Sequence, residues 1–468
     1  MSRDGIRDKV AIVGVGCCRF GENWDQSPSD MIVDAAYEAY ADAGIEDPQK
    51  QIDAVFTGSL YSQAGPHECA DALKLFDKPV SMVSNYCATG TDAFRYGVMS
   101  LAAGMYDRVL VVGYDKPKDR GVSGPSVMMD GVRDLPKTPA GWFSLCAATY
   151  FEKYGAGRED LARIAVKNHH NGTLAPKSFL KREITVEDVL NARMISWPFG
   201  LYDCAAQTDG AAAVVITRSD LARHHRDDPV LVKAVTIRSG PNPQKDPGND
   251  FLSWKPNGWA ARDVYQQAGI ADPRREIGVA QVHDCFSLTE LLAYEDLGFC
   301  EKGSAKEHIA AGTFELGGDL PVNTDGGLKT FGHPTGATGV RMIYENTLQL
   351  QGRAGERQVA NPKLALSHNL GGHPTACGIA ISVSLNARSR TRSSPSRTTS
   401  AVTPPPAGSR SSGATERAAV LSEPALRLND RSGCPEPREG LIYRGIGPPG
   451  GPPLFQEGVS IRDFRSRV

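Results

Sequence analysis

The feature that most constrains the fold is a repeated alternation of short apolar runs with helix-like segments. Apolar runs predict strands at residues 10–20, 52–60 and 108–116, and an amphipathic pattern predicts a helix at 29–44. The stretch 80–104 has the pattern of a strand, a turn and a helix. Strands that alternate with helices at this spacing indicate a mostly parallel α/β sheet with helices on both faces.

A second series of the same kind follows in the C-terminal half. Strands predicted at 209–218 and 230–240 close the first series. The second series comprises helices predicted at 260–269, 288–299 and 337–352 and strands predicted at 278–286, 364–372 and 377–385. Each half contains a strand, a reactive residue and a helix in this order, so we expect a pseudo-repeat.

Composition divides the chain further. Residues 117–205 contain Gly, Pro and Met among short helical pieces, which predicts a loop domain inserted over the sheet. We therefore expect a first half at 1–240 that includes this loop domain and a second half at 241–387. Residues 388–468 are rich in Ser, Arg and Pro, which predicts a disordered tail.

Charge and cysteine content exclude several classes of function. The 52 basic and 54 acidic residues give a net charge of −2, which offers no basis for binding nucleic acid or an anionic membrane. No apolar run approaches the roughly 20 residues of a membrane span, and the N-terminus lacks a signal-peptide pattern. The ten cysteines are scattered and form no C-x-x-C pair. We expect a cytoplasmic protein with free thiols and no metal.

The stretch "NYCATG" places Cys87 between a strand and a helix. A thiol at a helix N-terminus is exposed to the positive end of the macrodipole, which is expected to lower its pKa toward neutrality. Backbone N–H groups there can also receive an oxyanion. The alternative is a buried cysteine at a packed turn, and this stretch alone does not decide between them.

The stretch "FGHPTGATG" places His333 in a glycine-rich turn that leads into a helix. A histidine in such a turn could accept the proton of Cys87 or donate a hydrogen bond to a thioester oxygen. Alone, it could equally be a satisfied loop histidine. The Walker spacing of a phosphate-binding loop is missing.

The stretch "HDCFSLTELL" places three polar side chains directly before a helix. His283 and Cys285 are two residues apart on an extended segment, so both are expected to face one side. Cys285 could then act as a proton donor and acceptor, and His283 could polarise a carbonyl. Asp284 is expected to cap the following helix.

Taken together and in this order, the three stretches resemble the thiolase superfamily. The resemblance is strongest to the sterol-carrier-protein-type and archaeal-type thiolases, which are often called acetyl-CoA acetyltransferases. The resemblance spans about residues 8–386. It implies a five-layered α-β-α-β-α core of two similar halves with an inserted loop domain. It also implies a homodimer or a dimer of dimers, coenzyme A as co-substrate and no bound cofactor.

The resemblance assigns roles to particular residues. Cys87 matches the acylated nucleophile, and His333 matches the residue that activates it and lines an oxyanion hole. Asn369 stands where other thiolases carry a second cysteine, and the resemblance gives that role to Cys285. The N–H groups of Gly371 and Cys87 would form the second oxyanion hole. Cys377, eight residues beyond Asn369, is interpreted as structural.

The implied function is a thiolase that cleaves a 3-ketoacyl-CoA with CoA, or runs the reverse condensation, in lipid, fatty-acid or sterol side-chain metabolism. Alternatives are a thiolase-fold aldolase that acts with a small accessory protein, a ketosynthase, and a non-catalytic acyl-CoA-binding subunit. The aldolases lack the nucleophilic cysteine, so the presence of Cys87, Cys285 and both histidines favours a thiolase. The residues that bind CoA are not identified by sequence.

Overall fold

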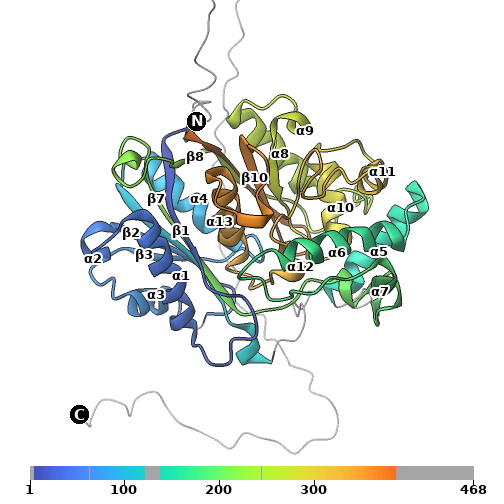
Figure 1. The fold of residues 1–468 in the computed structure, drawn as a ribbon, viewed down its shortest axis with the longest axis horizontal. Coiled ribbons are helices and arrows are strands. Elements are labelled where there is room, and N and C mark those ends of the chain that lie inside the picture. Colours follow the sequence, from blue (N-terminus) through green and yellow to red (C-terminus); the bar gives the residue numbers. More distant parts are fainter. Residues whose placement is uncertain (1–4, 63, 122–137, 244, 386–468) are drawn as a thin grey trace, which may run out of the picture. The chain divides into compact units, whose positions relative to one another are not determined.

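The computed structural model describes residues 5–62, 64–121, 138–243 and 245–385 (Figure 1). All of them belong to one unit of the chain, Met1–Ser396. The predicted tail at 388–468 lies outside the described residues, as do residues 122–137 of the predicted loop domain.

The helices and strands follow the predicted alternation. The strands are β1 (Val10–Cys17), β2 (Ala54–Gly58), β3 (Val80–Val83), β4 (Arg108–Asp115), β5 (Met194–Ser196), β6 (Phe199–Gly200), β7 (Gly210–Arg218), β8 (Val230–Ser239), β9 (Val279–Gln281), β10 (Leu364–Gly371) and β11 (Ala376–Ser384). The helices are α1 (Pro28–Ala43), α2 (Pro48–Gln51), α3 (Pro66–Leu73), α4 (Thr89–Ala102), α5 (Pro139–Tyr154), α6 (Arg158–Thr173), α7 (Val186–Asn191), α8 (Lys255–Ala268), α9 (Pro273–Glu276), α10 (Ser287–Asp296), α11 (Ala305–Ala310), α12 (Gly327–Thr330) and α13 (Thr338–Gln351). Short 3-10 turns lie at Pro117–Arg120, Leu201–Asp203, Ala222–His224 and Gly355–Arg357.

Local sequence explains the first strand–helix unit. Ser27 and Asp30 form a capping box at the start of α1, where Pro28 adds a preset φ. Helix α1 then packs directly on β1, because a Cβ at Gly14 would lie 2.3 Å from the Ala39 carbonyl oxygen. The glycine therefore allows helix and strand to approach more closely than any other residue would.

Among the described residues, nine strands form one sheet in the order β3-β2-β4-β7-β1-β8-β11-β10-β9. Strands β1 and β8 are joined by only two residue pairs, Ala11 with Leu231 and Ile12 with Val230. The nine strands therefore divide into two smaller sheets, β3-β2-β4-β7-β1 and β8-β11-β10-β9, which are joined only through these two residue pairs. The predicted boundary at 240/241 puts β8 in the first half, whereas its long pairing with β11 places it in the second.

The expectation of a mostly parallel sheet is wrong. Strand β2 pairs in parallel with β3 and β4, and β10 with β9. The pairs β1–β7, β4–β7, β1–β8, β8–β11 and β10–β11 are all antiparallel. Helices cover both faces of each sheet, so most strands are buried on both sides whatever their direction, with the edge strand β3 as an exception. The apolar runs therefore carried no information on direction.

The two halves repeat one topology. In the first, β2 is parallel to β4, which is antiparallel to β7, which is antiparallel to β1. In the second, β9, β10, β11 and β8 follow the same pattern. Helices α4 and α13 contact strands of both halves and form a shared central layer, with α1 and α3 on one outer face and α8 and α10 on the other (Figure 1). The predicted five-layered core of two similar halves is confirmed.

The described part of the loop domain is mainly helical. Helices α5, α6 and α7 and the β5–β6 hairpin belong to it, and α6 packs against α10, α11 and α12 of the second half. No helix in the described ranges is long and apolar enough to span a bilayer.

Candidate active site

Cys87 lies in the turn between β3 and α4. Thr89 fixes this turn, because its hydroxyl oxygen accepts a hydrogen bond of 2.7 Å from the Asn85 N–H and donates to the Tyr86 carbonyl. Tyr86 adopts a positive φ of 47°, a tight bend that turns the chain toward the helix. The predicted place of Cys87, directly before a helix N-terminus, is confirmed.

His333 lies in a loop that packs on the ends of β2 and β4. Gly332 has a φ of 122°, which only glycine adopts readily. A Cβ at Gly336 would lie 2.5 Å from the Gly58 carbonyl oxygen, so the loop could not sit against the first sheet with a larger residue there. The His333 N–H also donates to the Ala206 carbonyl at 2.9 Å. The glycines of this motif therefore bring His333 close to the turn that carries Cys87.

His283 and Cys285 follow β9, which ends at Gln281, earlier than predicted. Both side chains line the cavity that Cys87 and His333 line, as their spacing on an extended segment predicts. Asp284 does not cap α10. Its carboxylate accepts hydrogen bonds from the N–H groups of Leu328 (2.6 Å) and Lys329 (3.1 Å) in α12. The following helix α10 has Phe286 as its N-cap residue, with Thr289 as a partner.

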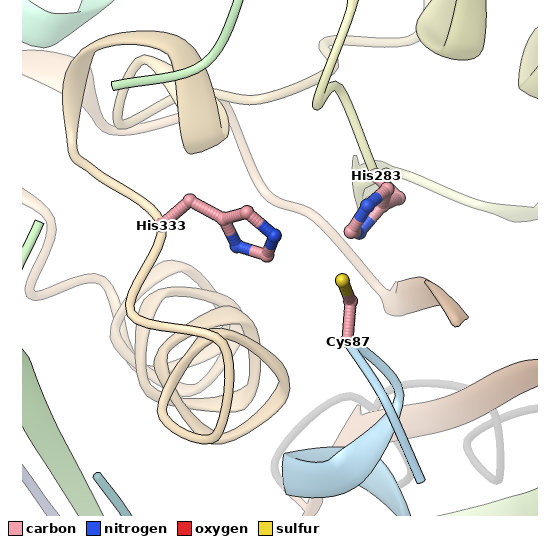
Figure 2. A group of neighbouring side chains, drawn as sticks. All are labelled: Cys87, His283 and His333. Carbon is pink, nitrogen blue, oxygen red and sulfur yellow. The ribbon is translucent and has the colours of Figure 1, made fainter. Parts of the chain in front are cut away.

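The structure therefore brings all four predicted side chains to one cavity. The Cys87 sulfur and one ring nitrogen each of His283 and His333 lie within 4.8 Å of one another, and Figure 2 shows both rings directed toward the sulfur. Further lining residues are Tyr61, Pro139, Phe143, Ala205, Gln207, Phe286, Thr335, Leu370, Gly372 and His373. The walls are mostly apolar, and the polar groups converge on one thiol.

The expectation that the Cys87 pKa is lowered toward neutrality is wrong. Burial raises it to about 12, against the smaller lowering effect of the Gly372 N–H. Burial also lowers the His333 pKa to about 3 and the His283 pKa well below its usual value, and the charge of Arg341 adds to both shifts. The resting site therefore holds a neutral thiol between two neutral imidazoles. At neutral pH the Cys87 thiol therefore keeps its proton.

Hydrogen bonds assign a different tautomer to each histidine. The Thr338 hydroxyl donates to the Pro334 carbonyl at 2.9 Å, so it accepts the 2.7 Å bond from Nδ1–H of His333. His333 is left with a free lone pair on Nε2. At His283, the amide NH2 of Asn369 lies 3.2 Å from Nδ1 and donates to it. His283 therefore carries its proton on Nε2.

Gly371 was expected to provide an N–H group to an oxyanion hole. In the structure it is Gly372, at a φ of 64°, that lines the cavity and directs its N–H at the Cys87 sulfur. Gly371 packs behind the turn instead, where a Cβ would lie 2.9 Å from the Asn85 carbonyl oxygen. The oxyanion role stays a prediction, and the geometry favours the N–H of Gly372 with that of Cys87.

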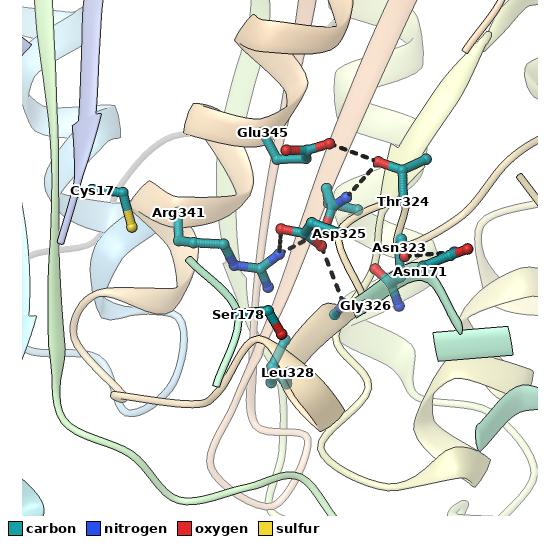
Figure 3. Close-up of polar contacts among 12 residues, drawn as sticks. Cys17, Asn171, Ser178, Asn323, Thr324, Asp325, Gly326, Leu328, Arg341 and Glu345 are labelled. Carbon is teal, nitrogen blue, oxygen red and sulfur yellow. Dashed lines mark hydrogen bonds and ion pairs between the residues drawn. The ribbon is translucent and has the colours of Figure 1, made fainter. Parts of the chain in front are cut away.

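A buried ion pair lies behind His333. The Arg341 guanidinium pairs with the Asp325 carboxylate, and both side chains are fully buried (Figure 3). Arg341 also donates to Gln281 Oε1 at 2.8 Å, which ties α13 to β9. The pair joins the elements that carry His333 and His283, and its cation disfavours protonation of both rings.

A second, larger cavity adjoins the first and shares Ala205, Gln207 and Phe286 with it. Its wall includes the basic side chains of Lys118 and Arg182. Helix α5 contributes Pro139 and Phe143 to the first cavity and Ala140 to the second. Cys377 lies buried in the core on β11, consistent with a structural role.

Sequence reasoning missed three residues of the site, Thr338, Gly372 and His373, and it also missed the contact that Asn369 makes. His373 lines the cavity, and its buried Nε2 has no hydrogen-bond partner within the described residues. Only its position two residues beyond Gly371 could have suggested it. The other contacts depend on tertiary geometry.

Comparisons with known proteins identify the family of the chain. A family model for the thiolase C-terminal domain matches residues 248–383. An acetyl-CoA acetyltransferase of Methanothermobacter thermautotrophicus is 36% identical over 377 residues, covering 78% of this chain and 97% of that one. Sterol carrier protein 2 of Gallus gallus is 31% identical over 388 residues, covering 78% and 70%. The chain therefore belongs to the thiolase superfamily.

Solved structures extend the comparison. An Ltp2-ChsH2(DUF35) aldolase superposes with a TM-score of 0.70 at 26% identity, covering 81% of this chain and 99% of that one. Human mitochondrial 3-ketoacyl-CoA thiolase in complex with CoA has a TM-score of 0.59 at 16% identity, covering 81% of this chain and 98% of that one. The second likeness concerns the fold alone.

Proposed function

We propose that the protein is a thiolase that cleaves a 3-ketoacyl-CoA with coenzyme A through an acyl-Cys87 intermediate, or runs the reverse condensation. The observation that supports this proposal is the convergence of the Cys87 thiol, two neutral imidazoles and the Cys285 thiol on one cavity. The acetyl-CoA acetyltransferase relatives support acyl transfer of this type.

In the first half-reaction, Nε2 of His333 accepts the thiol proton as the Cys87 sulfur attacks the 3-keto carbon. The N–H groups of Cys87 and Gly372 receive the negative charge on the keto oxygen. The C2–C3 bond then breaks, its electron pair forms the enolate of the shorter acyl-CoA, and Cys285 donates a proton to C2. His283 stabilises the enolate oxygen through its Nε2–H.

In the second half-reaction, the Cys285 thiolate removes the proton of CoA. The CoA sulfur attacks the acyl-Cys87 carbonyl, and the Cys87 sulfur leaves and recovers its proton from His333. Both thiols return to their starting state, so the cycle needs no redox partner. The high pKa of Cys285, which burial and the nearby Cys87 raise, suits a group that holds its proton until the enolate forms.

Coenzyme A is proposed to enter through the larger cavity. This cavity adjoins the cavity of the thiols at Ala205, Gln207 and Phe286, and its mostly apolar wall suits the pantetheine arm. Lys118 and Arg182 in its wall are suited to the phosphates. The acyl chain is proposed to lie against Phe143 and Leu370, and its place in lipid, fatty-acid or sterol side-chain metabolism stays a prediction.

A homodimer is part of the proposal. Within the described part of the chain, strand β3 lies at one end of the sheet order, so its outer hydrogen-bonding edge is open to a partner strand. Large apolar side chains are exposed on and near it: Phe76, Met82, Tyr86, Tyr96 and Met99. A second copy that pairs with this edge would cover them. A dimer of dimers, a small accessory protein and a cytoplasmic location also remain predictions.

A second candidate is an aldolase that acts with a partner protein, because one structural neighbour is a DUF35-containing aldolase. Aldol cleavage requires a base and an oxyanion hole but no thiol nucleophile. The position of Cys87 between His283 and His333 therefore favours the thiolase.

The test is a thiolysis assay with acetoacetyl-CoA and with a long or branched 3-ketoacyl-CoA plus CoA, for the wild type, Cys87→Ala and Cys285→Ala. We expect both variants to lose turnover, with the Cys285 variant still showing an acyl mass on Cys87. A parallel assay supplies a 3-hydroxyacyl-CoA without CoA. Cleavage of that substrate by Cys87→Ala, together with no thiolysis by the wild type, would establish the aldolase instead.

A further inference from the structure

The three groups at the centre of the site form a donor set that suits a soft metal. A thiolate and two imidazoles are typical ligands of zinc, and their atoms lie within 4.8 Å of one another here. A reactive site of this composition risks capture by any available zinc ion, which would block Cys87. The outer contacts of the two histidines decide whether that can happen.

His333 has the outer contact of a metal ligand. A histidine that binds a metal through one ring nitrogen usually donates the other N–H to an acceptor. Nδ1–H of His333 donates to Thr338 Oγ1 at 2.7 Å, which leaves Nε2 with a free lone pair. This side of the cluster presents no obstacle to zinc.

His283 has the opposite contact. The Thr91 hydroxyl donates to Asn369 Oδ1 at 3.3 Å, which turns the amide NH2 of Asn369 toward His283. That NH2 lies 3.2 Å from Nδ1, and both side chains are fully buried or nearly so. Since Nδ1 accepts, the neutral ring holds its proton on Nε2. Such a nitrogen donates to an oxygen and has no lone pair for a metal.

We propose that Asn369 is a positioning residue that makes His283 an Nε2–H donor toward a substrate carbonyl oxygen and so prevents the Cys87–His283–His333 cluster from binding zinc. The donor half of this inference rests on the proposed thiolase function. The exclusion of zinc does not, because it follows from hydrogen bonds within the protein.

The decisive variant is Asn369→Asp, which keeps the shape of the side chain and reverses the hydrogen bond. The new carboxylate accepts from Nδ1–H of His283 and frees the lone pair of Nε2. We expect zinc affinity at least 10-fold above that of the wild type, the scale on which outer partners change metal affinity. Cobalt(II) should give a thiolate-to-metal absorption band in this variant. The matched control Cys87→Ala/Asn369→Asp should show neither the gain nor the band.

The tautomer can be measured in the unaltered protein. With 15N-labelled histidine, the NMR shifts of His283 should show the proton on Nε2 in the wild type and on Nδ1 in Asn369→Asp. A proton on Nδ1 of His283 in the wild type would overturn the inference, as would wild-type zinc affinity equal to that of a folded Asn369→Asp variant. Neither measurement needs turnover. A wild type without thiolysis but with these tautomers would refute the proposed function and leave zinc exclusion standing.

Discussion

Replacing Thr338 by Val tests how the chain prepares His333 to act as a base. The two side chains have nearly the same shape, but valine has no acceptor for Nδ1–H of His333. Thr338 is fully buried, so no bulk water replaces the lost oxygen. The ring is then expected to favour the other tautomer, which places its proton on the nitrogen that must accept one from Cys87.

The size of the effect follows from the cost of an unpaired buried donor, about 1–3 kcal/mol. Each 1.36 kcal/mol corresponds to a tenfold change in a population. The reactive tautomer should therefore fall by about 5- to 150-fold, and the rate at which Cys87 is acylated should fall with it. The KM for CoA should change little, because Thr338 does not line either cavity.

The assay is single-turnover acylation of Cys87 by acetoacetyl-CoA, stopped in acid and read by mass spectrometry. Thr338→Ser keeps the hydroxyl and should restore most of the rate, while thermal melting checks that each variant is folded. An acylation rate of Thr338→Val within twofold of the wild type, in a folded protein, would refute the tautomer argument.

Three further predictions concern the thiol, the buried ion pair and the dimer. Burial raises the Cys87 pKa to about 12, so the thiolate fraction of Cys87 should rise about tenfold per pH unit from pH 7 to 10, and its rate of alkylation by iodoacetamide should rise with it. Peptide mass spectrometry measures this rate, and a plateau near neutral pH would contradict the prediction. Asp325→Asn leaves the buried Arg341 cation without its anion and should lower the free energy of unfolding, measured by urea denaturation, by about 3–5 kcal/mol. The control Asp319→Asn removes an ion pair whose Asp319 side chain is 81% exposed, and it should change the free energy of unfolding by less than about 1 kcal/mol. Met82→Asp on strand β3 should convert a dimer to a monomer in light scattering, while Met194→Asp in the loop domain should not; an unchanged dimer in both would place the interface elsewhere.

The sequence predicted which side chains meet at one cavity better than it predicted their environment. All four side chains lie shortly before a helix, at the end of a strand-like or glycine-rich stretch: Cys87, His283, Cys285 and His333. Turns of this kind lie close together at one edge of an α/β sheet. Their convergence could therefore be inferred from their positions. The Cys87 pKa could not, because the helix N-terminus is visible in the sequence while the burial of the sulfur depends on residues from both halves and the loop domain.

The direction of the strands and the hydrogen-bond partners of the site residues could not be predicted from the sequence, for related reasons. Apolar runs report burial on both faces and nothing about direction, so the antiparallel pairs of β7 and β11 could not be seen. Asn369 was identified only as the residue in place of a cysteine. Its contact with His283 joins residues 86 positions apart, and no local pattern encodes it.

Asp284 explains why a charged residue stands between His283 and Cys285. On an extended segment its side chain points away from the cavity, toward the N-terminus of α12. There its carboxylate accepts from Leu328 and Lys329, while the Asn168 amide donates to it at 3.0 Å. Helix α12 ends at Thr330, three residues before His333. The Asp284 carboxylate therefore ties the turn that carries His283 and Cys285 to the loop that carries His333. Two motifs that are 50 residues apart in the sequence are therefore held together by a side chain of the first motif that does not line the cavity.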